Sequence, residues 1–192
     1  MLEKLVIRRA VYLPRSRNTS LLPQNFFDHV LKWCKEVVGK ELDVRFKCHH
    51  KRIVARHFKD SVSHVKQMTG REHYDIQHTI VAMIAGRVPP RFLHAVRALI
   101  DFIYQAQSPV HTDSSIDQME SSLREFHAHK DVIIKVGARR TKAAGSKDDF
   151  YIPKLELLLS FTRAIRKNGG LIQYSADVSE HLLITHCKHP FE

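Results

Sequence analysis

Apolar residues recur at helical spacing along most of this 192-residue chain, and glycines and prolines mark where each run stops. The strongest run follows Pro89 and Pro90, which interrupt the preceding segment and pre-set φ for a first helical turn. No stretch alternates strands with helices in the way that a parallel sheet requires. The sequence therefore predicts an all-α fold around one core helix with a wide apolar face: Phe92, Leu93, Val96, Leu99, Ile100, Ile103 and Tyr104.

The remaining apolar runs predict an irregular array of about six or seven helices joined by short connections. Thr112 or Asp113 is expected to cap a long helix, and Gly137 to end it. A capping box of Thr69 and Glu72 is expected to start another. Besides the core helix, the expected helices are 23–38, a short helix within 41–58, 59–68, 70–85, 113–136, 153–167 and 178–187.

Length and composition favour one helical domain over residues 21–192, preceded by a loosely ordered basic arm over residues 1–20. Lysines and arginines number 31 and acidic residues number 20, which leaves a formal net charge of +11. Such a charge favours contact with polyanions such as nucleic acid, and it equally describes a solvated basic surface. The charge alone leaves both interpretations open.

Cysteine content and hydropathy bear on where the protein works. Three cysteines at irregular spacing argue against a secreted disulfide framework and suit a reducing compartment. No apolar run approaches the roughly 20 residues needed to cross a bilayer, and Arg8 and Arg9 follow the first apolar residues, whereas a signal peptide has its charges first. An intracellular protein without a membrane partner is expected, and its Lys- and Arg-rich runs are compatible with the nucleus.

Cysteine- and histidine-containing segments are candidates for metal binding or catalysis. Cys48, His49, His50 and His57 are suitable ligand types. Their spacing lacks the two close pairs of a structural zinc site, so no metal site is predicted. Cys34 falls on an apolar stripe, which favours a buried structural thiol over a nucleophile. The chain has no glycine pattern typical of phosphate or dinucleotide binding, so neither a cofactor nor a small-molecule substrate is predicted.

Three basic clusters are candidates for contact with nucleic-acid phosphates. One lies within residues 47–56, one in an exposed loop expected over residues 138–149, and one late in the helix expected over residues 153–167. None forms a recognised base-reading motif, and a solvated face is the alternative interpretation. The predicted phosphate-binding residues are Lys51, Arg52, Arg56, Arg139, Arg140, Lys142, Arg163, Arg166 and Lys167.

Several unusual blocks of sequence follow one another between residues 22 and 190. They are Asp28 to Cys34, Glu41 to Phe46, Arg56 to Lys59, Lys66 to His73, Ala95 to Phe102, Glu125 to Lys130, Tyr151 to Glu156 and Gln173 to Pro190. In this order they resemble the carboxy-terminal half of the Plavaka transposases, a group of fungal DNA transposons related to the CACTA supergroup.

The resemblance implies an enzyme with an RNase-H-like core that supplies two aspartates, followed by an all-helical insertion and a returning helix that supplies a glutamate. Together such carboxylates hold two magnesium ions for phosphodiester cleavage. Glu180 matches the position of the family's final acid. Taken from the residues alone, Glu180 completes a capping box that begins at Asp177.

The chain also departs from the family pattern. About twenty residues precede the first matched block, too few for a β-sheet core, so both core aspartates are expected to be absent. Asp43 and Asp60 lie in the helical region and are not replacements for them. The chain stops at Glu192, where family members run on.

The resemblance and the departures from it together predict a truncated or domesticated transposase-derived helical module without catalysis of its own. Its expected partners are DNA, a full-length transposase or a second copy of the chain, bound through the basic surface. Two alternatives stay open. One is a metal-dependent nuclease or transposase subunit that another chain completes, with magnesium as its cofactor in that case only. The other is a transposon relic with no selected function.

Overall fold

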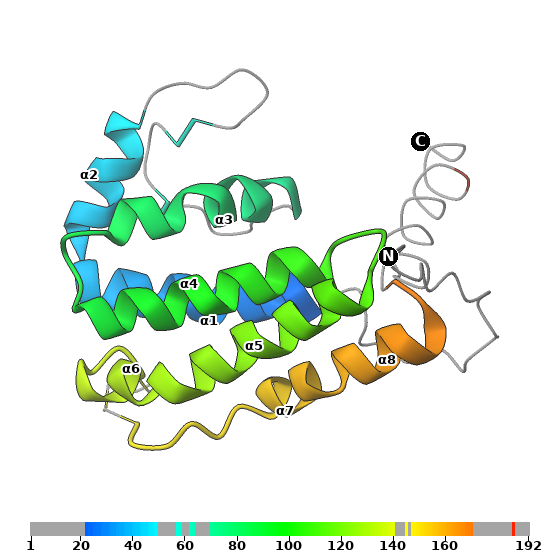
Figure 1. Ribbon diagram of the computed structural model, residues 1–192. Coiled ribbons are helices and arrows are strands. Elements are labelled where there is room, and N and C mark those ends of the chain that lie inside the picture. Colours follow the sequence, from blue (N-terminus) through cyan, green and yellow to red (C-terminus); the bar gives the residue numbers. More distant parts are fainter. Residues whose placement is uncertain are drawn as a thin grey trace.

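Eight α-helices follow one another in the computed structural model, which describes residues 22–49, 57–58, 62–63, 70–140, 145, 147–170 and 186. No β-strand occurs within these residues, so the predicted all-α fold class is confirmed. Figure 1 labels the helices, whose bounds are α1 Leu22–Val38, α2 Lys40–Cys48, α3 Gly70–Ile84, α4 Pro90–Ala106, α5 Asp113–His129, α6 Asp131–Lys135, α7 Pro153–Leu159 and α8 Phe161–Asn168.

Helix α4 lies at the centre of the fold, between α3 and α5, and it also contacts α1 (Figure 1). It begins at Pro90, where the missing N–H removes no helical hydrogen bond. Each large apolar side chain buried here contributes about 1.5–3 kcal/mol relative to an exposed one. The predicted core helix is confirmed, and its buried residues include small ones that let the neighbouring helices approach: Phe92, Ala95, Val96, Ala98, Leu99, Ile100, Phe102, Ile103 and Ala106.

A capping box fixes the start of α5. The Thr112 Oγ1 atom accepts a hydrogen bond from the backbone N–H of Ser115 at 3.2 Å. In return, the Ser115 Oγ atom accepts one from the backbone N–H of Thr112 at 3.0 Å. Of the two predicted N-caps, Thr112 is therefore the correct one. Gly137 follows the last helical turn with a φ of 70°, a conformation that favours glycine, and it ends this helical region as predicted.

Two helices predicted as continuous are each interrupted at one residue. The helix predicted over residues 113–136 divides at Lys130 into α5 and α6, where the N–H of Ile133 donates to the Lys130 carbonyl oxygen at 3.0 Å. The helix predicted over residues 153–167 divides at Ser160 into α7 and α8. The Ser160 Oγ atom donates to the Leu157 carbonyl oxygen at 2.7 Å, and this local bond competes with the helical backbone pattern.

Other predicted elements are described only in part. Helix α2 confirms the short helix expected within residues 41–58. Of the helix expected over residues 59–68, Val62 and Ser63 are described, and they form a bend and a turn with Val62 buried. The arm expected over residues 1–20 lies outside the described residues, as do Thr69 and, apart from His186, the helix expected over residues 178–187.

The loop expected to be exposed over residues 138–149 is held against the core at its start. The Arg139 guanidinium lies over the ring of Phe150, 5.3 Å from the ring centroid. Trp33 and Phe126 contact the same ring edge to face. The prediction of an exposed loop is therefore wrong at Arg139, because the aromatic cluster around Phe150 draws this residue into the core.

Candidate functional site

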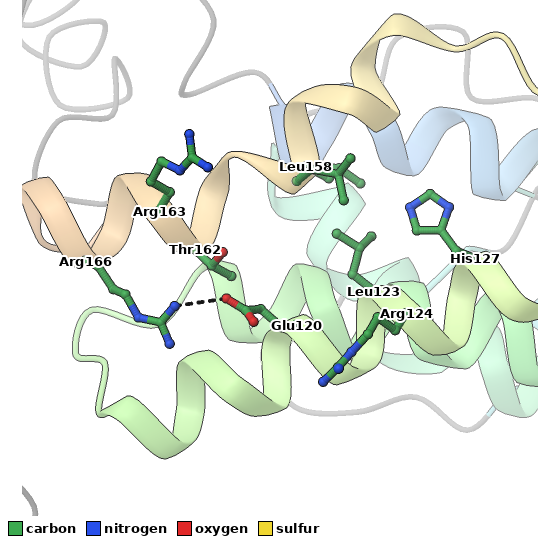
Figure 2. Close-up of a pocket in the computed structure, with 9 residues that line it drawn as sticks. Glu120, Leu123, Arg124, His127, Leu158, Thr162, Arg163 and Arg166 are labelled. Carbon is green, nitrogen blue, oxygen red and sulfur yellow. Dashed lines mark hydrogen bonds and ion pairs between the residues drawn. The ribbon is translucent and has the colours of Figure 1, made fainter.

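A groove of about 460 Å³ lies between α5 and the pair α7–α8 (Figure 2). It is the candidate site because it combines a concave apolar floor with several cationic side chains, the composition that binds an anionic ligand with an apolar part. The residues that line it come from these three helices and are Glu120, Leu123, Arg124, His127, Leu158, Leu159, Thr162, Arg163 and Arg166.

The floor of the groove is largely apolar because the bordering helices turn buried positions toward it. Leu123 lies on the buried stripe of α5, four residues after Met119. Leu158 of α7 and Thr162 of α8 are buried on either side of the break at Ser160. The floor therefore favours apolar groups, with the Thr162 hydroxyl as its polar exception.

Arg124 and Arg163 stand on opposite lips of the groove, one on α5 and the other on α8. Figure 2 shows their side chains extending outward, away from the floor and from each other. Both side chains are exposed, and within the described part of the chain neither one has a hydrogen bond or an ion pair. A guanidinium stays charged at physiological pH and carries five N–H donors, so both residues are available to an external anion.

Arg166 connects the two sides of the groove. Its Nη1 atom lies 3.1 Å from Glu120 Oε1, and its Nη2 atom lies 3.0 Å from Asp117 Oδ1 (Figure 2 draws the contact with Glu120). These two contacts attach α8 to α5 and offset much of the local positive charge. Because the groups are exposed, each ion pair contributes about 0–1 kcal/mol to stability. Arg166 therefore holds the two sides of the groove together, and little of its positive charge is available to a ligand.

His127 adds an aromatic ring to the groove but little charge near neutral pH. Burial holds the pKa of His127 below its ordinary value of 6.5, and the nearby charge of Lys130 lowers it further. The imidazole is therefore neutral at pH 7. Its Nε2 atom is buried and has no hydrogen-bond partner among the described residues. A ligand that reached this atom would satisfy a polar group that those residues leave unpaired.

The predicted cluster of Arg163, Arg166 and Lys167 is the one that the structure brings to the groove. Lys167 is exposed in the last turn of α8, one helical turn after Arg163 and on the same side of that helix. Arg163 and Lys167, on one lip, have no ion-pair partner within the described part of the chain, whereas Arg166 is held by two carboxylates.

The predicted cluster around Arg139 lies elsewhere, and Arg139 requires a correction. The residue is 7% exposed, and its Nη2 atom donates to Asp149 Oδ1 at 3.0 Å and to the Tyr151 carbonyl oxygen at 3.3 Å. A guanidinium buried and bonded in this way cannot contact a phosphate without leaving the core. Arg140 is exposed, and its Nε atom lies 2.8 Å from Glu36 Oε2.

The remaining predicted site residues cannot be placed. Lys51, Arg52, Arg56 and Lys142 lie outside the described residues. The same holds for Glu180, the position that matches the final acid in the resemblance. Their assignments stay predictions from the sequence.

The described residues form neither a metal-binding cluster nor a site with a reactive thiol. The described residues contain no group of three or more His, Cys, Asp and Glu side chains that could hold a metal ion. The His57 Nε2 atom lies 3.0 Å from the His49 carbonyl oxygen. Cys34 is fully buried, as predicted, and burial raises the pKa of its thiol far above the ordinary value, which keeps it protonated. Cys48 is exposed.

Sequence reasoning missed Arg124 because it stands outside every run of basic residues. It lies between Leu123 and Glu125, so a linear scan sees one isolated cation. Helical spacing would have shown its neighbours, because Glu120 lies four residues before Arg124 and His127 three residues after it. All three residues therefore lie on one flank of α5. The pairing of this flank with α8 depends on the fold.

No protein-family model, curated protein or solved structure matches this chain. The resemblance to the Plavaka transposases therefore stays a prediction from the sequence blocks. Among the helices described, none is long and apolar enough to span a bilayer.

Proposed function

We propose that this chain is a transposase-derived helical module that binds nucleic acid through the cationic lips of the groove between α5 and α8. The observation that carries the proposal is that Arg124 and Arg163 are exposed on opposite lips and lack an internal partner among the described residues. Lys167 extends the cationic lip on α8. The resemblance to the Plavaka transposases supplies the transposase part of the proposal.

Electrostatics favour a polyanion as the ligand of these lips. The whole chain carries a formal net charge of +11, so a nucleic acid is attracted at long range. Outward-turned guanidinium groups suit the phosphates of a duplex, because the duplex is too wide to enter the groove and meets only its rims. Each phosphate neutralised releases counterions, so the proposed binding weakens steeply with salt.

Binding of duplex DNA across a salt series tests the proposal. Replacing both Arg124 and Arg163 with alanine removes two proposed phosphate contacts, so the slope of log affinity against log salt should decrease in magnitude by about two. The matched control replaces Arg91 and Arg97, two exposed arginines of α4 that do not line the groove and lie 3.5 Å and 3.7 Å from Asp131 and Asp101. The control should keep nearly the full slope.

Three outcomes distinguish this function from the alternatives. Equal losses in the two double variants would mean that diffuse charge binds DNA and that the groove is not the interface. Absence of binding at low salt would contradict a nucleic-acid function. If magnesium is included and the DNA is nicked, and Glu180→Ala abolishes the nicking, the chain is instead a subunit of a metal-dependent nuclease.

A further inference from the structure

The apolar part of the groove is not explained by phosphate contacts. Leu159 lines the groove and is 60% exposed, and Leu157 and Tyr151 are exposed on or beside the same helix, α7. A single exposed leucine is ordinary on a protein surface. An exposed leucine beside a concave apolar floor instead forms a continuous apolar surface, and such surfaces mark binding sites.

The shape of the groove suits a helix. It lies between two helical elements, α5 on one side and α7–α8 on the other (Figure 2). A groove between two helices accepts the side-chain ridge of a third helix, and amphipathic helices bind such grooves through apolar residues one turn apart. Leu123 and Leu158 on the floor and Leu159 at the edge offer apolar contact to that ridge.

The charges of the groove define what must flank the apolar stripe of that helix. The one lining carboxylate, Glu120, is paired with Arg166 at 3.1 Å. Arg124 stands on one lip and Arg163 on the other, so cations without a partner among the described residues lie on both sides of the apolar floor. The complementary ligand carries an apolar stripe with a carboxylate row on each side. An acidic amphipathic helix has this pattern, since Asp and Glu at positions next to the stripe point toward both lips.

Nucleic-acid bases are a poorer match to the floor. Proteins that bind single strands stack successive bases on several aromatic side chains, whereas His127 is the one aromatic ring among the described residues that line the groove. Leucines instead match the branched apolar side chains of a protein helix.

We propose that the groove between α5 and α7–α8 docks an acidic amphipathic helix of a protein partner. Leu159 and the floor contact the apolar stripe of that helix, and Arg124 and Arg163 pair with its carboxylates. This goes beyond nucleic-acid binding, because it assigns the apolar floor and Leu159, which phosphates do not use. The two ligands share the arginines and therefore compete for them.

A labelled synthetic peptide tests the proposal by fluorescence anisotropy with the full chain. The peptide carries leucines at i, i+4, i+7 and i+11 and glutamates on both flanks of that stripe. Leu159→Glu places a negative charge at the apolar edge and should weaken peptide binding about tenfold or more. The matched control is Val44→Glu, which makes the same change in charge at a residue of α2 that is 55% exposed and outside the groove. It should leave peptide affinity within about twofold.

Further probes separate the peptide from nucleic acid and from general attraction of charge. A peptide with lysines in place of the glutamates and one with serines in place of the leucines should both fail to bind. Duplex DNA should bind Leu159→Glu and Val44→Glu equally, so nucleic-acid binding can succeed or fail independently of this site. No binding of the first peptide, equal binding by the two protein variants, or Leu159-dependent binding of a thymidine oligonucleotide in place of the peptide would overturn the proposal. Circular dichroism of both variants confirms that the helices remain intact.

Discussion

Arginine residues in this chain have two opposite roles, and burial separates them. Arg139 is buried and donates to Asp149 and Tyr151, so its charge is used inside the molecule. Arg163 is exposed and unpaired among the described residues, so its charge is available to a ligand. The two side chains are chemically identical, so only their surroundings distinguish the structural cation from the binding cation.

Replacing Arg139 with alanine should lower the free energy of unfolding by about 1–3 kcal/mol, because it removes the hydrogen bonds that the buried guanidinium donates to Asp149 and Tyr151 and opens space beside Phe150. Urea unfolding followed by circular dichroism measures the change. The neighbouring Arg140→Ala removes an exposed ion pair with Glu36 and should cost no more than about 1 kcal/mol. Equal losses for the two variants would contradict the buried structural role of Arg139.

At the level of elements, α5 connects the core to the candidate site. It packs against α4 and borders the groove with Glu120, Leu123, Arg124 and His127. Any change in where α5 begins therefore affects both the core and the groove. The capping box at Thr112 fixes that start, because it satisfies backbone N–H groups that the helix itself leaves free.

Thr112→Ala should destabilise the protein by about 0.5–2 kcal/mol, the usual cost of losing an N-cap side chain. It removes the bond from the Ser115 N–H to Thr112 Oγ1. Chemical denaturation quantifies the loss. Ser114→Ala is the control, because Ser114 is exposed in the same turn and its Oγ atom, 3.4 Å from Thr112 Oγ1, does not accept the capping bond from the Ser115 N–H. If Ser114→Ala costs as much as Thr112→Ala, the capping box is not what stabilises the start of α5.

At the level of the whole molecule, the sequence predicts what local spacing determines and misses what distant segments determine. Apolar periodicity and Pro89-Pro90 are local, so the core helix α4 is predicted correctly. Arg139 is held by Phe150 and Asp149, which come ten or more residues later in the chain, and a linear pattern does not contain these contacts. The groove depends on the packing of α5 against α8, and only this packing places Arg124 on a lip of the groove opposite Arg163.

Three histidines make the stability of the whole molecule depend on pH. Burial holds the pKa values of His73, His111 and His127 below 6.5; Asp28 partly offsets this at His73, and a backbone hydrogen bond with Ser108 partly offsets it at His111. In the unfolded chain these groups titrate near 6.5. As the pH falls through 6.5, the unfolded chain therefore binds protons before the folded chain does, and the free energy of unfolding decreases. This contribution is fully present above pH 6.5 and is lost as the pH falls toward the folded-state pKa values.

Urea midpoints measured at about pH 8 and about pH 5.5 should therefore differ, with the lower midpoint at the lower pH. His73→Gln should reduce that difference, because it removes one of the buried titrating groups. His78→Gln serves as the control, since His78 is exposed on the same helix, α3. This variant also has one histidine fewer, but it leaves His73, His111 and His127 in place. If both variants reduce the difference equally, repulsion among the many positive charges of the chain, and not the burial of His73, governs its acid sensitivity.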